Sequence, residues 1–316
     1  MLKVEIKLDE MPQFESLLDL QKVFPTEHDC IKYLEKRRWK GIIISPCHST
    51  SKVYKCKNNR YKCKECGKYF NVKTRMIFEN TRQPLINWFY AVYMLFNHKK
   101  GISSHQLARD LAITQKSAWY MLKLLRRGVK CPIFRKMLKG IVEIDETFLG
   151  GSNLNRHWNK KAPKCQGRNW KDKIPVLGIL EKTTGRFFAQ VVPNTQLSTL
   201  VPIIEANVEK DSDLCSDEWY RNSNLNQNFN HYIVNHSAKQ YSVNGKSVNG
   251  GENRWSHLKR MIYGTYHKIS RKHSQGYVDE FVLKNNTRDY SNQERFDLVF
   301  SLMVGKHITY QQIISN

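Results

Sequence analysis

The hydrophobic positions in the second half of the chain form short runs of strand length, separated by turn residues. Strands are predicted, in this order, at Val142–Leu149, Val176–Leu180, Arg186–Val192 and in the few residues up to Asp217. Between the last two, apolar residues from Leu197 to Val208 follow helical spacing. Apolar residues recur with the same spacing after Glu252, so that acid is expected on a helix. Strands alternating with helices predict an α/β domain.

The first half of the chain predicts helices on both sides of a cysteine-rich segment. Thr26 is placed to cap a helix that carries Ile31 and Leu34 on one face, and this helix is expected to pack beside the cysteine-rich segment. Residues 84–96 are almost continuously apolar and predict a buried helix.

Residues 101–127 predict a helix-turn-helix. Ser103 or Ser104 caps its first helix, and Thr114 caps its second. In such a motif the early positions of the second helix face the DNA major groove, and basic residues near its end contact phosphates. The predicted DNA contacts here are Gln115, Lys116, Arg126 and Arg127. The alternative is a helical hairpin that only supports the core.

Three acidic residues lie on the predicted strands and helix. Asp145 falls within an apolar strand, where a carboxylate needs a cation or a hydrogen-bond partner, Asp217 ends another strand, and Glu252 begins a helix. Such acids suit two Mg²⁺ or Mn²⁺ ions, which take oxygen ligands and promote in-line displacement at a phosphodiester. By strand alternation Glu143 shares the face of Asp145 and is either an auxiliary ligand or a salt-bridge partner.

The charge balance indicates a nucleic-acid partner. The 316 residues include 52 Lys and Arg against 28 Asp and Glu, for a net charge of +24. The basic residues are spread along the chain, which favours an extended nucleic-acid footprint over a membrane-binding patch. No apolar run approaches the roughly 20 residues that span a bilayer, and the first residues lack a secretory pattern. We therefore expect an intracellular protein, in the cytoplasm or nucleoid of a bacterium or the nucleus of a eukaryote.

Four of the eight cysteines lie within 20 residues, from Cys47 to Cys66. In a reducing compartment this crowding favours metal binding over disulfides. Cys63 and Cys66 are spaced as in a zinc knuckle, whereas the other half of the module is irregular. The predicted Zn²⁺ ligands are Cys47, Cys63 and Cys66, with His48 or Cys56 as the fourth. Because structural zinc normally has four ligands, a module without metal is the alternative.

These patterns divide the chain into five regions. They are an N-terminal helical segment (1–40), a zinc-ribbon-like module (41–78), a helical, helix-turn-helix-like region (79–130), an α/β catalytic domain (138–290) and a C-terminal helical tail (291–316). Three strands, a helix and a further strand that carries an acid form the order of the ribonuclease-H-like fold, a mixed sheet flanked by helices.

Several segments together resemble the motifs of a family of insertion-sequence transposases. They are Glu143–Gly151, Ser216–Trp219, Val234–Ser237, Asn249–Arg260 and Gly264–His267, and in the N-terminal half Tyr61–Phe70 and Gly101–Ala108. The resemblance implies an N-terminal zinc ribbon and a ribonuclease-H-like core with two aspartates and a glutamate; Merlin-type eukaryotic elements are relatives. The family's first Cys-Pro-x-Cys appears here as Ser45-Pro46-Cys47, with one cysteine lost.

The resemblance also implies roles for single residues. The metal ligands would be Asp145, Asp217 and Glu252, and the DNA contacts at this site would be Lys259, Arg260 and Asn249. Lys259 shares a helix face with Glu252, where it contacts the DNA end or is an ordinary solvated lysine. Asn249 positions Glu252 or the DNA. His236 and His267 match as well, either as hydrogen-bonded structural residues or as catalytic ones.

The activity so implied is cleavage and joining of double-stranded DNA at the ends of a mobile element. Two ends must be held together, so a homodimer or a larger synaptic complex is expected. Two other functions stay open: a decayed transposase that only binds DNA, and a nuclease of the same fold that hydrolyses without joining. The complete set of acids favours the transposase, and the altered ribbon keeps the DNA-binding protein as the alternative.

Overall fold

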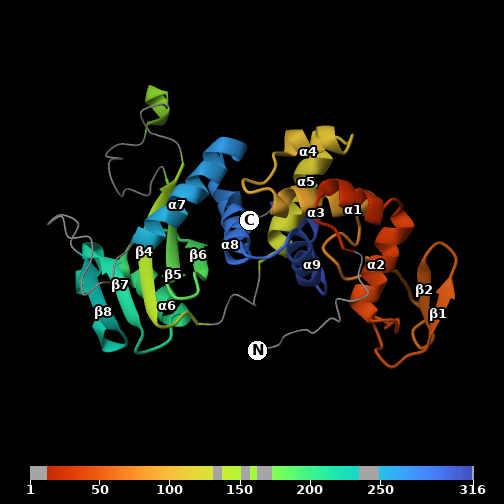
Figure 1. Ribbon diagram of the computed structural model, residues 1–316, viewed down its shortest axis with the longest axis horizontal. Coiled ribbons are helices and arrows are strands. Elements are labelled where there is room, and N and C mark those ends of the chain that lie inside the picture. The colour runs from red at the N-terminus through yellow and green to blue at the C-terminus, as the bar shows by residue number, and fades with distance from the viewer. Residues whose placement is uncertain (1–12, 131–136, 151–156, 162–172, 235–248, 315–316) are drawn as a thin grey trace. The chain divides into compact units, whose positions relative to one another are not determined.

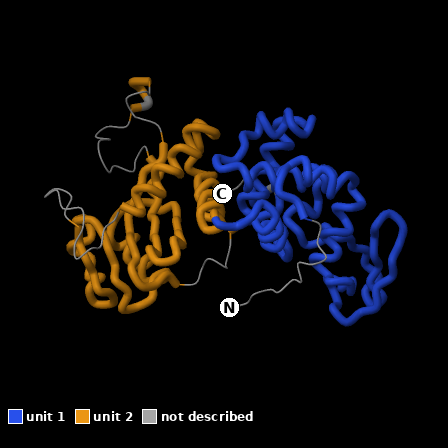
Figure 2. The backbone as a smooth tube through the Cα atoms, viewed as in Figure 1, with its two compact units in different colours: residues 1–129, 289–316 blue, residues 130–288 orange. Residues whose placement is uncertain are grey.

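The computed structural model describes residues 13–130, 137–150, 157–161, 173–234 and 249–314. The chain forms two compact units, one made of residues 1–129 and 289–316 and the other of residues 130–288 (Figure 2). Within the described residues, no helix combines the length and the apolar character that crossing a membrane requires.

The first unit is mainly helical. Its helices are α1 (Leu17–Val23), α2 (Glu27–Trp39), α3 (Leu85–Asn97), α4 (Ser104–Asp110), α5 (Gln115–Gly128), α9 (Asn292–Met303) and α10 (Tyr310–Ile314) (Figure 1). Thr26 caps α2 by accepting the backbone N–H of Asp29, as its sequence predicts. Most of α3 is buried, which agrees with its almost continuous apolar sequence.

Aromatic residues join the C-terminal helix α9 to the core of this unit. The ring centroids of Phe89 in α3 and Phe300 in α9 lie 4.7 Å apart, and those of Phe89 and Phe296 lie 5.4 Å apart. Nearby, the buried carboxylate of Asp297 in α9 pairs with Arg37 of α2 at 2.9 Å. The last part of the chain thus completes the unit that the first part begins, which no sequence pattern indicated.

A small antiparallel sheet belongs to the same unit. Its strands are β1 (Val53–Cys56), β2 (Arg60–Cys63) and β3 (Tyr69–Phe70), in the order β1-β2-β3. Trp39, at the end of α2, packs edge-on against Tyr61 with ring centroids 5.5 Å apart. The Tyr61 hydroxyl donates a hydrogen bond to Glu35 of α2 at 2.6 Å. Helix α2 therefore packs beside this sheet, as the sequence predicts.

The second unit is an α/β domain with a five-stranded mixed sheet. Its strands are β4 (Ile141–Leu149), β5 (Ile174–Glu181), β6 (Phe187–Val191), β7 (Asp213–Asp217) and β8 (Asn230–Val234), in the order β6-β5-β4-β7-β8. Neighbours among β4, β5 and β6 are antiparallel, whereas β7 runs parallel to β4 and β8 parallel to β7. The predicted strands appear with bounds that differ by a few residues.

Helices cover both faces of this sheet (Figure 1). On one face, Ile144 of β4 packs with Leu200 of α6 (Leu197–Asn207). The other face carries α7 (Asn249–Met261) and α8 (Ser274–Asn286), whose Trp255 and Phe281 pack against β5 and β6. Every residue of β5 is buried, as expected for a strand covered on both sides. Because side chains alternate along β4, Asp145 faces the α7 side.

Candidate active site and metal-binding cluster

Two of the predicted metal ligands lie on neighbouring parallel strands. Glu143 of β4 pairs with Cys215 of β7, and this register, continued by two residues, sets Asp145 beside Asp217. Adjacent strands lie about 4.8 Å apart, and residues in parallel register point to the same face. Asp145 and Asp217 therefore share one face of the sheet, near the carboxyl end of β7.

Helix α7 brings Glu252 to the same place. The indole N–H of Trp255 donates to Asp145 Oδ2 at 3.0 Å, and the Trp255 ring lies so close to Gly178 that a Cβ there would come within 2.3 Å of it. A Cβ on Gly251 would lie 3.3 Å from the Asp145 Cβ. Glu252 follows directly, is exposed, and its charge acts on Asp145. Contacts of α7 with β4 and β5 thus bring Glu252 to the edge where Asp145 and Asp217 lie.

An ionised carboxylate is unfavourable at Asp145. Burial raises the pKa of Asp145 to about 7; the backbone N–H of Glu146 opposes this shift, and the charges of Asp217 and Glu252 add to it. A bound cation favours the ionised form of such a group. The oxygen donors and the concentrated negative charge fit a hard divalent ion such as Mg²⁺ or Mn²⁺.

The structure adds a buried contact that the sequence did not predict. Asp217 Oδ1 accepts the backbone N–H of Trp219 at 3.0 Å and so begins a short 3₁₀ helix, Glu218–Asn222. This turn carries the buried Tyr220, whose hydroxyl donates a hydrogen bond to Glu146 of β4. Burial first, and then the charge of Glu146, raise the pKa of Tyr220. Because 74 positions separate the partners, no local pattern predicts this contact.

Glu143 lies in the interior beneath the start of α7. Its side chain is fully buried, Oε2 accepts the backbone N–H of Gly251 at 3.0 Å, and Oε1 lies 3.2 Å from Nζ of Lys182. Of the two roles that the sequence left open, auxiliary ligand or salt-bridge partner, the structure contains the salt bridge.

The remaining residues expected at this site lie mostly on α7. Asn249 and Arg260 are exposed, and Lys259 is half-buried. Lys259 follows Glu252 by two helical turns, on the same face. His267 follows the π-helical turn Ile262–Tyr266 that continues α7, and its Nδ1 lies 3.1 Å from the Tyr263 carbonyl oxygen. His236 lies outside the described residues.

The predicted pair of helices at residues 101–127 is present in the first unit. Ser103 caps α4, and Thr114 caps α5. Gln115 and Lys116 begin α5, and both are exposed. The Gln115 side-chain amide donates to the Ser104 hydroxyl at 2.8 Å, which ties the first turns of the two helices together.

Arg126 differs from its predicted role. Only 5% of the residue is exposed, because it falls on the buried face of α5 with Leu122 and Leu125. So little exposed surface disfavours the expected phosphate contact at Arg126. Arg127 is half-buried and donates to the carbonyl oxygen of Gln312.

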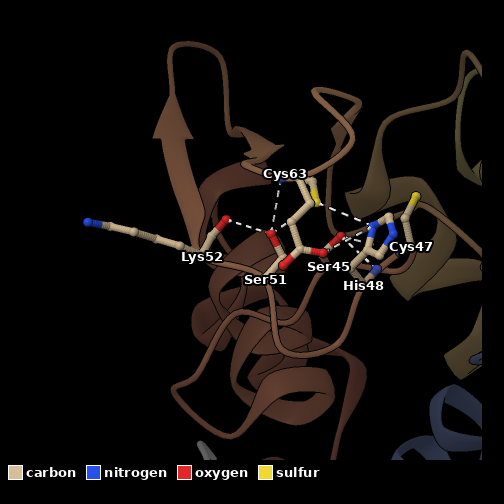
Figure 3. A network of polar contacts seen from close by, with 7 residues as sticks. Ser45, Cys47, His48, Ser51, Lys52 and Cys63 are labelled. Atoms are coloured by element: carbon tan, nitrogen blue, oxygen red, sulfur yellow. Dashed lines mark hydrogen bonds and ion pairs between the residues drawn. The ribbon is translucent and has the colours of Figure 1, made fainter.

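The cysteine-rich segment gathers metal-ligating side chains (Figure 3). The ligand atoms of His48, Cys63 and Cys66 all lie within 4.8 Å of one another, and this is the one such group of three in the described part of the chain. His48 Nδ1 is 3.9 Å from Cys63 Sγ, and the thiol of Cys47 interacts with that of Cys66. Neither Cys47 nor Cys56 belongs to this group of three, but only Cys47 interacts with one of its members.

The surroundings of Cys63 favour the thiolate. The backbone N–H of Cys66, and then the hydroxyls of Ser45 and Ser51, lower the pKa of Cys63 by hydrogen bonding. Ser45 is buried, and its oxygen also accepts the backbone N–H of Cys47 at 3.3 Å. Because the thiolate is the metal-binding form of cysteine, this donor set of sulfur and imidazole fits Zn²⁺.

Comparisons with known proteins show the family to which the chain belongs. Residues 137–286, which carry all three acids, match a family model described as the ISXO2-like transposase domain. Over 109 residues, 34% of this chain and 87% of its relative, the chain is 31% identical to an uncharacterized transposase-like protein of Haemophilus influenzae. The chain belongs to the insertion-sequence transposases.

A longer match extends this relationship over most of the transposase. It is 24% identical over 277 residues to an uncharacterized protein in transposable element ISH50 of Halobacterium salinarum, covering 83% of this chain and 92% of that protein. The similar solved structures are more distant. A chain of a simian T-cell lymphotropic virus intasome in complex with a PP2A regulatory subunit aligns over 61% of this chain and 68% of its own length, with 11% identity and a TM-score of 0.28. A chain of a pre-cleavage Mos1 transpososome aligns over 70% and 80%, with 13% identity and a TM-score of 0.20. These scores are too low to support the fold assignment.

Proposed function

We propose that this transposase cleaves double-stranded DNA at the ends of its insertion sequence and joins the freed ends to target DNA. The observation that carries the proposal is the convergence of Asp145, Asp217 and Glu252 from β4, β7 and α7 on one face of a mixed sheet. The strand order β6-β5-β4-β7-β8, with three antiparallel strands followed by two parallel to β4, supports a ribonuclease-H-like core.

In this proposal the three acids hold two divalent ions. Asp145, Asp217 and Glu252 would hold Mg²⁺ or Mn²⁺, and the chemistry supplied at such a site is activation of the attacking hydroxyl and stabilisation of the leaving oxygen. Trp255 orients Asp145 through its indole N–H, while the exposed Glu252 lies where α7 meets solvent.

DNA would be bound by both units. Lys259 and Arg260 on α7 follow Glu252 and would contact phosphates near the cleaved bond. In the first unit, the exposed Gln115 and Lys116 at the start of α5 would enter a major groove, with Arg127 near its end. The net charge of +24 supports an extended polyanionic partner. Since two element ends must be held together, we expect a homodimer or a larger assembly on DNA.

The cysteine-rich module would hold a structural Zn²⁺ ion. Its ligands would be His48, Cys63 and Cys66, with Cys47 as the fourth because its thiol already interacts with that of Cys66. Zinc bound in this way would stabilise the small β1-β2-β3 sheet, which has few buried residues of its own.

The proposed reaction is tested on labelled DNA that carries the sequences flanking the gene, with Mg²⁺ or Mn²⁺ present. The native protein should give nicked and joined products, and Glu252→Gln should give neither. Glu209→Gln, which removes an exposed acid of the same unit, should behave as the native protein does. Nicking without joining would identify a nuclease instead, and binding without cleavage by the native protein would identify a DNA-binding protein.

A further inference from the structure

We propose that Glu143 is a positioning residue that locks the first turn of α7 against β4 and thereby sets Glu252 beside Asp145. The inference rests on the proposed function of the acidic site. Glu143 acts at the contact between β4 and α7, next to Asp145 and Glu252.

The carboxylate of Glu143 holds the start of α7 directly. Gly251 is the third residue of this helix, so its N–H is one of the first few that have no partner within the helix. That N–H donates to Glu143 Oε2 at 3.0 Å, although 108 positions separate the two residues. A carboxylate at this end of a helix is also favoured by the helix dipole. Glu143 therefore acts as an N-terminal cap supplied by a strand.

The rest of the carboxylate is occupied by positive charge. Lys182, just after β5, lies 3.2 Å from Oε1, and the charge of Glu143 also acts on Arg254, one turn further along α7. A buried ionised carboxylate persists only when charges and hydrogen bonds compensate it. At Glu143 the Gly251 N–H satisfies Oε2, and the Lys182 ammonium lies near Oε1, which accepts no hydrogen bond. This arrangement favours a structural link over an auxiliary ligand.

Two glycines allow the helix to come this close. A Cβ on Gly250 would lie 2.6 Å from Glu143 Oε2 and 2.7 Å from Leu180 Cδ2, distances at which atoms overlap. A Cβ on Gly251 would lie 3.3 Å from the Asp145 Cβ. Gly250 and Gly251 thus permit a contact that Glu143 then fixes. Because Glu252 is the next residue, the contact determines where its backbone lies.

The test is Mn²⁺ binding to the full-length protein, measured by electron paramagnetic resonance with Zn²⁺ present to fill the cysteine cluster. Glu143→Ala should weaken Mn²⁺ binding about 10- to 100-fold, the range for residues that orient metal ligands. Glu143→Gln keeps an oxygen that can accept the Gly251 N–H and should recover most of the affinity. This rescue separates positioning by the hydrogen bond from a general loss of packing.

A matched control is Glu181→Ala. Glu181 is a buried acid of the same sheet that accepts the Lys139 N–H at 3.0 Å and lies 3.8 Å from Arg186, on partners outside α7. Its loss should lower the melting temperature without changing Mn²⁺ affinity.

A second variant is needed if Glu143→Ala does not fold. Gly250→Ala retains Glu143 but pushes α7 away from it, and this variant should also weaken Mn²⁺ binding.

The outcomes separate this inference from the proposed function. Loss of Mn²⁺ binding in Asp145→Asn would support the acidic metal site. If folded Glu143→Ala then keeps native Mn²⁺ affinity, the positioning role is overturned. Gly250→Ala replaces Glu143→Ala in this comparison if the latter does not fold. If Asp145→Asn itself keeps native affinity, the proposed metal site fails, and the inference that rests on it fails too. Weakened binding in Glu143→Ala, with recovery in Glu143→Gln and none of this in Glu181→Ala, would establish the positioning role.

Discussion

The side chain of Trp255 both packs against the sheet and donates a hydrogen bond to Asp145. Its ring covers Gly178 on β5, the residue paired with Asp145 across the strands, and its N–H donates to the Asp145 carboxylate. Packing against a glycine leaves the indole little room to turn, so the donor stays directed at Asp145. A residue that appears in the sequence as an ordinary apolar position of a helix thus orients the central acid.

Trp255→Phe should therefore weaken metal binding more than it weakens the fold. Phenylalanine keeps most of the ring packing but removes the donor, so Mn²⁺ affinity should fall about 10-fold, as for other residues that orient ligands. The free energy of unfolding should fall by only about 1 kcal/mol, the net value of one hydrogen bond. Trp219→Phe is the matched control, since its indole donates to the Thr195 carbonyl oxygen at 3.0 Å. Equal Mn²⁺ affinities in the two variants would contradict the orienting role of Trp255.

Residues of the cysteine-rich segment differ in their expected binding of zinc. Cys63→Ser and His48→Ala remove members of the cluster and should lower the zinc content of the purified protein to well under one ion per chain. Cys56→Ser changes a cysteine of the same module outside the cluster and should keep the native content. Atomic absorption after dialysis measures this difference. Loss of zinc in Cys56→Ser would show that the fourth ligand is Cys56.

At the scale of elements, the start and the end of α5 have different surroundings. Gln115 and Lys116 are exposed at its beginning, whereas Arg126 is buried near its end. Helical periodicity explains the difference, because Arg126 is separated from the buried Leu122 by about one turn. A basic residue near a helix terminus is a DNA contact only when its face of the helix is open.

Substitutions on α5 should separate DNA binding from stability. Lys116→Ala should weaken binding to DNA of the element ends more than binding to unrelated DNA, because a residue in the major groove contacts base edges. Loss of its charge should also lower the salt dependence by about one counterion. Arg126→Ala should mainly lower the melting temperature, because it empties a buried position. Fluorescence anisotropy at several salt concentrations, together with thermal melting, measures both. A salt dependence that falls with Arg126→Ala and stays unchanged with Lys116→Ala would reverse this assignment.

At the scale of the whole molecule, the two ends of the chain build one unit. Phe296 and Phe300 of α9 pack against Phe89 of α3, and Arg37 of α2 pairs with Asp297. The α/β unit is the continuous segment 130–288 between these parts. Removal of the C-terminal segment would therefore damage the unit that carries α5, although the two are distant in sequence.

Phe296→Ala should destabilise the helical unit by about 3–5 kcal/mol, the usual cost of removing a buried phenylalanine ring. Val304→Ala is the control, because Val304 is 41% exposed and close in sequence. Hydrogen exchange of the α3 and α9 amides, measured at increasing urea concentration, gives the change in the free energy of unfolding of that unit. Deletion of residues 289–316 should remove the protection of α3 altogether, and retained protection after the deletion would show that α9 is dispensable for the core.

Much of the fold and site was accessible from the sequence because it depends on local spacing. Alternation over β4 predicts the strand and the shared face of Glu143 and Asp145, and the caps Thr26 and Thr114 mark helix starts that the structure contains. Periodicity of side chains and capping are properties of neighbouring residues. The same local patterns placed Asp145, Asp217 and Glu252 on their elements. The segments around these acids also resemble transposase motifs.

The tertiary structure alone decided what depends on residues far apart in the chain. The hydrogen bond between Gly251 and Glu143, the contact between Tyr220 and Glu146, the burial of Arg126 and the place of α9 beside α3 follow from packing across separate elements. Such contacts form because buried polar groups must find partners and apolar faces must be covered, wherever the partners lie in the sequence. The sequence determined the elements and the acids that they carry, and the tertiary structure determined which side chains orient those acids.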